Sequence, residues 1–107
     1  MTDEQTATAG LPQPPPHLSD SSAAWFRDVV GKYKLEPHEL RLLTLACEAL
    51  DEVDEAREII EADGLVITNS HGNKKRHPAA SVRDKAATRF YRLVEKLGIS
   101  EASNGKT

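Results

Sequence analysis

The fold of this chain is decided by residues 37–64, PHELRLLTLACEALDEVDEAREIIEADG. Apolar residues recur there at intervals of three and four, which is the period of one face of an α-helix. Pro37 suits the first helical turn, and Gly64 is typical of a helix end. The stretch predicts one long helix, roughly 40 Å in length at 1.5 Å per residue. Its apolar stripe consists of Leu42, Leu45, Ala49, Val53, Ala56 and Ile60, widened by Leu43, Ala46 and Leu50.

The sign of the charge reverses at Gly64. Residues 1–63 contain 5 Lys and Arg against 14 Asp and Glu, a net charge of −9. Residues 64–107 contain 9 against 3, a net charge of +6. The overall charge of −3 therefore conceals an acidic half and a basic half. This separation favours a polyanion as the partner of the basic half and protein surfaces as partners of the acidic half.

A short β-ribbon is predicted at about residues 65–76. Leu65 to Thr68 is a β-branched run, and Asn69 to Asn73 has the composition of a turn. Two strands are not stable alone in water, so the ribbon must pack on the helices.

A second, basic helix follows the ribbon. It is predicted to start between His77-Pro78 and Ser81, because Pro78 suits a first turn and Ser81 to Asp84 has the spacing of a capping box. Gly98 is the expected helix end. One side carries Val82, Ala86, Phe90, Leu93 and Leu97, and the opposite side carries Lys85, Arg89, Arg92 and Lys96. The helix is therefore amphipathic with a basic face.

The N-terminal part of the chain predicts one more helix and an arm. The helix begins at Ser21 or Ser22 and carries Trp25, Phe26, Val29, Val30 and Tyr33 at helical spacing. Its aromatic residues indicate that it docks either on the chain's own core or on a neighbouring subunit. Residues 1–20 are rich in proline and predict a disordered arm, and residues 100–107 predict a disordered tail. Residues 21–99 then form a single helical domain.

The predicted fold class is mainly α. A long acidic helix and a basic helix form a hairpin joined by a short β-ribbon, with an additional N-terminal helix. About 75 to 80 residues can fold, a length at which one core is marginally stabilising. The long helix also exceeds any partner in the chain, so we expect an oligomer. The candidate oligomerisation residues are Trp25, Phe26, Leu42, Leu45, Leu50, Val53 and Ile60.

Several classes of protein are disfavoured. No apolar run approaches the ~20 residues that span a bilayer, and the N-terminus does not resemble a secretory signal. Four scattered histidines and the single Cys47 lack the spacing of a zinc site or a disulfide framework, and the glycines do not cluster as a phosphate loop requires. Cys47 is interpreted as a small buried hydrophobe. We expect no catalytic residue, metal, cofactor or membrane segment, and a cytosolic location.

The basic segment is the candidate DNA contact. Its cations are Lys74, Lys75, Arg76, Arg83, Lys85, Arg89 and Arg92. This number is enough to contact several phosphates. Alternatively, the basic face is only solvated, or it pairs with the acidic run Glu48 to Asp63 of the same or a neighbouring chain. No residue identifies base-specific readout.

An ordered set of short motifs runs from Leu40 to Ile99. They are Leu42-Leu43, Ala49-Leu50-Asp51, Ala56-Arg57-Glu58-Ile59-Ile60, Asp63-Gly64-Leu65-Val66-Ile67-Thr68, Gly72, His77-Pro78-Ala79, and Phe90, Leu93 and Leu97-Gly98-Ile99. In this order they resemble the phage terminase small-subunit family. The resemblance implies a non-catalytic packaging component of the host cytoplasm. It would form a ring, bind double-stranded viral DNA and recruit a terminase large subunit with ATPase and nuclease activity.

Two other functions remain open from the residues alone. One is a small dimeric DNA-binding transcriptional regulator that acts at an operator. The other is a helical protein-interaction module without a nucleic-acid role, in which acidic and basic helices pair between subunits. No second short helix separates the Trp25 helix from the long one, so the sequence lacks a clear N-terminal helix-turn-helix.

Overall fold

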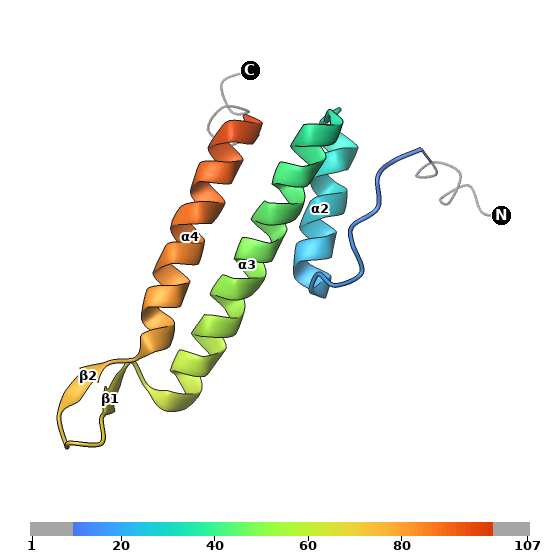
Figure 1. Ribbon diagram of the computed structural model, residues 1–107. Helices are drawn as coiled ribbons and strands as arrows, with labels where there is room; N and C mark the ends of the chain where they lie inside the picture. Colours follow the sequence, from blue (N-terminus) through green and yellow to red (C-terminus); the bar gives the residue numbers. More distant parts are fainter. Residues whose placement is uncertain (1–9, 100–107) are drawn as a thin grey trace.

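A computed structural model describes residues 10–99 of the protein (Figure 1). In this part of the chain the elements are α2 (Asp20–Lys32), α3 (Pro37–Asp63), β1 (Val66–Thr68), β2 (Lys74–Arg76) and α4 (Pro78–Leu97). Helices α3 and α4 run antiparallel as a hairpin, with the ribbon at their connection, and α2 packs beside the first half of α3. The predicted mainly helical fold, including the ribbon between the acidic and basic helices, is confirmed. Residues 1–9 of the predicted arm and the predicted tail at 100–107 lie outside the described residues.

The ends of the helices follow from their capping residues. Helix α2 begins at Asp20, one or two residues before the predicted start at Ser21 or Ser22, because the hydroxyl of Ser19 accepts a hydrogen bond from the Ser22 amide at 3.2 Å. Helix α4 begins at the His77-Pro78 end of the predicted interval. There the Nδ1 atom of His77 accepts the Ala79 amide hydrogen bond at 3.0 Å, and Ser81 lies inside the helix. Gly98 ends α4 with φ 69° and ψ 27°, the left-handed conformation that glycine adopts without a steric cost.

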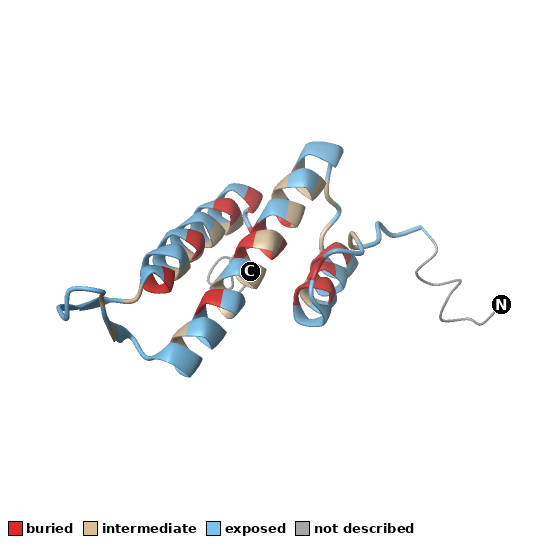
Figure 2. Cartoon of the chain, turned by 60° about the horizontal axis from the view of Figure 1, so that its bottom comes forward, coloured by how far each residue is buried: buried red, intermediate tan, exposed pale blue. Residues whose placement is uncertain are grey.

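The hydrophobic core lies at the end of the hairpin that α2 covers (Figure 2). Phe26 of α2, Leu43 and Cys47 of α3 and Leu97 of α4 all belong to it, and Leu43 and Cys47 are fully buried. The predicted burial of Cys47 is therefore confirmed. Trp25 also bridges α2 to α4, because its ring lies 5.5 Å from that of Phe90. Three helices thus close one core within a single chain.

The half of the hairpin next to the ribbon is packed differently. The buried side chains there are small, namely Ala56 of α3 and Ala79, Ala80 and Ala86 of α4. Alanine allows the two helices to approach closely but removes little apolar surface from water. Helix α2 does not extend to this half (Figure 1).

No helix within residues 10–99 is both long and apolar enough to cross a membrane.

The segment before α2 is attached to α3 by a carboxylate. Asp51 accepts hydrogen bonds from the Ser19 amide at 2.9 Å, the Ser19 hydroxyl at 2.5 Å and the Ser22 hydroxyl at 2.6 Å. Partial burial of Asp51 opposes ionisation, but these bonds hold the pKa of its carboxyl below its ordinary value. Leu18 is buried, and His17 contacts Glu48 at 2.7 Å. The last residues of the predicted arm therefore pack on the helices.

Candidate nucleic-acid interface

The ribbon carries three consecutive cations at the far end of the hairpin. Strands β1 and β2 are antiparallel, with Thr68 opposite Lys74 and Val66 opposite Arg76. Lys74, Lys75 and Arg76 form β2, and all three are exposed. Residues 65–76 contain no Asp or Glu. The ribbon is therefore a positively charged projection.

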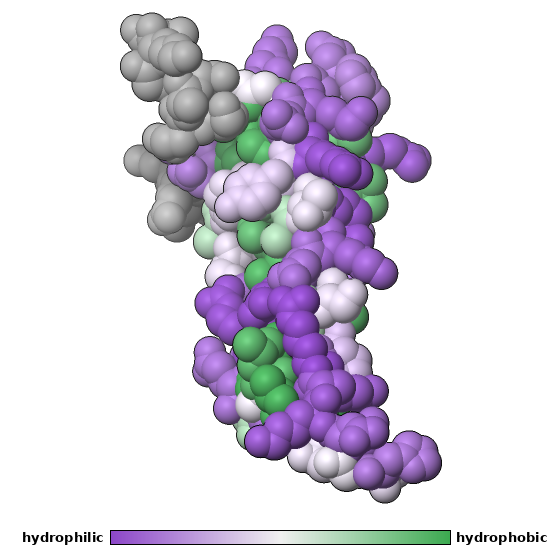
Figure 3. Space-filling view, turned by 90° about the vertical axis from the view of Figure 1, so that its left-hand side faces the viewer, coloured by the Kyte–Doolittle hydropathy of each residue, from purple (hydrophilic) through white to green (hydrophobic). Residues whose placement is uncertain are grey.

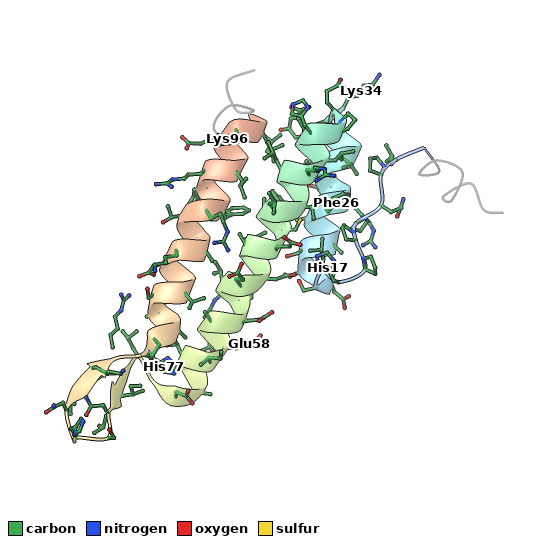
Figure 4. All side chains as sticks on the ribbon, in the orientation of Figure 1. His17, Phe26, Lys34, Glu58, His77 and Lys96 are labelled. Carbon is green, nitrogen blue, oxygen red and sulfur yellow. The ribbon has the colours of Figure 1, made fainter. Side chains whose placement is uncertain are left out.

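The base of the ribbon is fixed to both helices. The amide of His77 donates to the Leu65 carbonyl at 2.6 Å, and the Nε2 atom of His77 donates to the Asp63 carboxylate at 2.9 Å. Figure 4 shows His77 at this junction. Because Nδ1 of the same ring accepts the Ala79 amide, the geometry selects the neutral tautomer with hydrogen on Nε2. One side chain thus joins the end of α3 to the start of α4.

A second attachment runs from the ribbon to α4. Arg76 donates to Asp84 at 2.9 Å, and Arg83 contacts the same carboxylate at 3.3 Å. The hydrogen bond from Arg76, assisted by that from Arg83, lowers the pKa of Asp84. Both arginines were candidates for DNA contact, and both are engaged within the chain.

The basic stripe of α4 is partly neutralised by α3. Lys85, Arg89 and Arg92 lie on one face of the helix and line a shallow groove. Arg89 donates to Glu52 of α3, so the alternative of pairing with the acidic run of the same chain holds for this residue. Within residues 10–99, Lys74, Lys75, Lys85 and Arg92 make no ion pair. The candidate cations therefore form two groups, four unpaired and three paired.

A comparison with protein families bears on the functions that the residues left open. Residues 25–107 match the family model described as phage terminase, small subunit. The match extends from the aromatic face of α2 to the C-terminus and covers more than half of the chain. The chain belongs to this family. Membership gives it a role in phage DNA packaging. Neither the curated proteins nor the solved structures contain a significant match.

The candidate oligomerisation residues of this terminase small subunit occupy different environments. Phe26 is buried in the chain's own core, with 2% of its surface exposed, and Trp25 contacts Phe90 of the same chain. Leu42, Leu50, Val53 and Ile60 are half-buried. Leu45 is 48% exposed, whereas Leu43, which only widened the predicted stripe, is fully buried. The buried face of α3 is therefore rotated relative to the predicted one.

Other apolar side chains of the terminase small subunit are exposed near the ribbon. Ile59, Leu65, Val66 and Val82 are each about half exposed. Figure 3 shows a green apolar patch in the lower half of the face that carries α4 and the ribbon. None of these four residues was predicted to lie in an interface. Their apolar character is visible in the sequence, but their exposure is visible only in the folded chain.

The tip of the ribbon was predicted only as a turn. Ser70, His71, Gly72 and Asn73 are exposed there. Turn composition explained these residues, and nothing in their spacing distinguished a binding loop from an ordinary turn. Within residues 10–99, no three side chains of His, Cys, Asp or Glu gather as a potential metal site.

Proposed function

We propose that this terminase small subunit binds double-stranded viral DNA as an oligomeric ring and recruits the terminase large subunit in the infected host cell. The observation that carries the proposal is the family match over residues 25–107. The arrangement of the charged side chains supports the DNA-binding part, and the distribution of apolar surface supports the oligomer. The subunit itself carries out no chemistry in this proposal.

The unpaired cations are the strongest argument for DNA binding. Lys74, Lys75, Lys85 and Arg92 are exposed and unpaired within residues 10–99. Each cation that neutralises a phosphate contributes about −0.9 to the slope of log K against log salt concentration. Arg76, Arg83 and Arg89 are already paired with carboxylates, so they would have to exchange partners before they contribute. The proposed primary contacts are therefore the four unpaired cations.

The argument for an oligomer is that α2 packs on only one half of α3. Helix α2 covers only the half of α3 that holds the core, and at the other end of the hairpin Ile59, Val66 and Val82 remain exposed. An exposed apolar patch such as the green one in Figure 3 is typical of protein interfaces. A repeated contact between two different surfaces of the same chain closes into a ring when its rotation allows. Val53 and Ile60 are half-buried in the same half of α3 and remain candidates for the contact.

Salt-dependent binding tests the DNA contact. Fluorescence anisotropy with a labelled duplex, measured between 50 and 200 mM salt, gives the slope. The double variant Lys74→Ala, Lys75→Ala should reduce the magnitude of the slope by about 1.8, and so should Lys85→Ala with Arg92→Ala. The matched control is Lys32→Ala with Lys34→Ala, since Lys34 lies at the opposite end of the molecule (Figure 4). Equal slopes for the wild type and both test variants would contradict binding through these cations.

The mass of the protein in solution tests the ring. Light scattering should give an assembly larger than a dimer, and Val82→Glu should reduce its mass by placing a charge in the contact. A stable dimer that binds one operator sequence tightly would favour the transcriptional regulator instead. Sedimentation of the subunit mixed with purified large subunit tests recruitment, which should produce a faster-moving complex.

A further inference from the structure

The geometry points to a specific DNA-reading element: we propose that the tip of the ribbon, residues 69–73, enters the major groove and that the side chains of His71 and Asn73 contact base edges there. This inference rests on the proposed DNA binding and goes beyond it, because a phosphate contact alone carries no sequence information. It assigns a reading function to residues outside the basic set.

The dimensions of the ribbon fit the major groove. Three paired residues on each strand give a length of about 10 Å at 3.3 Å per residue, and the loop of residues 69–73 extends it further. The major groove is about 12 Å wide and 8.5 Å deep and admits a two-stranded ribbon, whereas the minor groove is about 6 Å wide. The ribbon also projects beyond the helical hairpin, so the helices do not block its tip (Figure 1).

The loop at the tip is ordered by its own hydrogen bonds. The side-chain oxygen of Asn69 accepts from the amides of His71 and Asn73, each at 2.9 Å. The Asn69 amide donates to the Asn73 carbonyl at 2.8 Å, and the Gly72 amide donates to the Asn69 carbonyl at 3.0 Å. Gly72 has φ +83°, which a side chain would strain. The loop is therefore held in one conformation before DNA binds, which lowers the entropic cost of binding.

The polar side chains at the tip are available for a ligand. Within residues 10–99, the side chains of His71 and Asn73 make no hydrogen bond, and both residues are exposed. An asparagine amide matches the adjacent acceptor and donor of adenine in the major groove. A neutral imidazole offers one donor and one acceptor. These are the groups that distinguish base pairs.

The cations next to the tip can contact the phosphates of the DNA while the tip contacts the bases. Lys74 and Lys75 follow the loop directly, and both are exposed at the start of β2. Arg76 and His77 attach the base of the ribbon to Asp84 and Asp63. The direction of the ribbon is thereby set by the hairpin. Phosphate contacts by the lysines would fix its register along the groove.

Selection from a randomised 20-base-pair duplex library tests the division of roles. The readout is the ratio of Kd values for the scrambled and the selected duplex at one salt concentration. Asn73→Ala should reduce this ratio about 5- to 150-fold, the loss expected for one bidentate base contact, without changing the salt slope. Lys74→Ala should weaken both duplexes equally and reduce the slope by about 0.9. An unchanged ratio in both Asn73→Ala and His71→Ala would overturn the inference.

Base analogues test the groove. Replacing adenine by 7-deazaadenine in the selected duplex removes a major-groove acceptor, and replacing guanine by inosine removes only a minor-groove amino group. Weaker binding with 7-deazaadenine and normal binding with inosine would support the inference, and the reverse pattern would overturn it. Thermal melting of each variant should match that of the wild type, since these side chains contact nothing buried. Wild-type protein that binds no duplex would instead refute the proposed function itself.

Discussion

Asp51 offers the sharpest test of how the N-terminal helix is held. Asp51→Ala removes the acceptor of two hydrogen bonds from Ser19 and one from Ser22. Hydrogen bonds to charged groups contribute about 1.5–3 kcal/mol each when well protected, and the two exposed Ser19 bonds contribute less. We therefore expect the free energy of unfolding to fall by about 2–3 kcal/mol, allowing for solvent at this partly exposed site. For a domain of this size the melting temperature should fall by about 10–20 °C.

Thermal denaturation followed by circular dichroism, at one fixed protein concentration, measures the effect. The control is Asp54→Ala, which removes an exposed ion pair with Arg57 and should change stability by less than about 0.5 kcal/mol. A double-mutant cycle between Asp51→Ala and Ser22→Ala should give a coupling of about 1 kcal/mol. A melting temperature for Asp51→Ala equal to that of the control, with no coupling to Ser22, would refute the anchoring role.

The pH dependence of stability should report the same anchor. The folded-state pKa of Asp51 lies below its ordinary value of 3.8, so its contribution is complete above the unfolded pKa. It is lost as the pH falls through the folded pKa. Asp51→Ala should therefore lose less stability than the wild type when the pH is lowered from 5 towards 3, measured as the urea midpoint. A parallel loss in both proteins would contradict the assignment.

Three further predictions concern the core and the turns. Leu43→Ala should lower the free energy of unfolding by about 3–4 kcal/mol, because Leu43 is fully buried, and urea denaturation measures this. Burial, together with the charges of Asp51 and Glu48, raises the pKa of Cys47 to about 12, so a thiol reagent should modify it only after unfolding; rapid modification of the native protein would be inconsistent with this. Gly31→Ala should raise the free energy of unfolding by about 0.5–1 kcal/mol, since nothing lies within 4 Å of the added atom. Gly64→Ala should lower the free energy of unfolding by about 1–3 kcal/mol, because Gly64 has φ +89°. Melting temperatures that shift in the same direction for the two variants would contradict this.

The elements of the fold were predictable because each has a local cause. Pro37 and Gly64 delimit α3 in the sequence as they do in the structure. The rotation of its buried face was not predictable, because three of the four residues 42–45 are leucines, and they point in different directions around the helix. Which of them is buried depends on where α2 and α4 pack. Leu43 faces both the α2 residues and the end of α4, and Leu45 does not.

The hydrogen bonds and ion pairs between helices were not predictable either, because they also depend on how the helices pack. Ser19 and Asp51 are 32 residues apart, a separation too large for any local sequence motif. Only the packing of the helices brings them together. The pairing of Arg89 with Glu52 spans 37 residues and likewise depends on the register of the hairpin. The charge pattern indicated which cations belong to the basic segment. It did not indicate which of them pair with carboxylates of α3 and α4 and which make no ion pair.

The closure of the core within one chain has a kinetic consequence. Phe26, Leu43 and Leu97 meet without a second copy, so each chain can complete its core before it encounters another. Folding is then a first-order process, with a rate independent of concentration, and association is a separate bimolecular step. Newly made chains at low abundance would accumulate as folded monomers, and the assembly of the proposed ring would begin only once their concentration had risen.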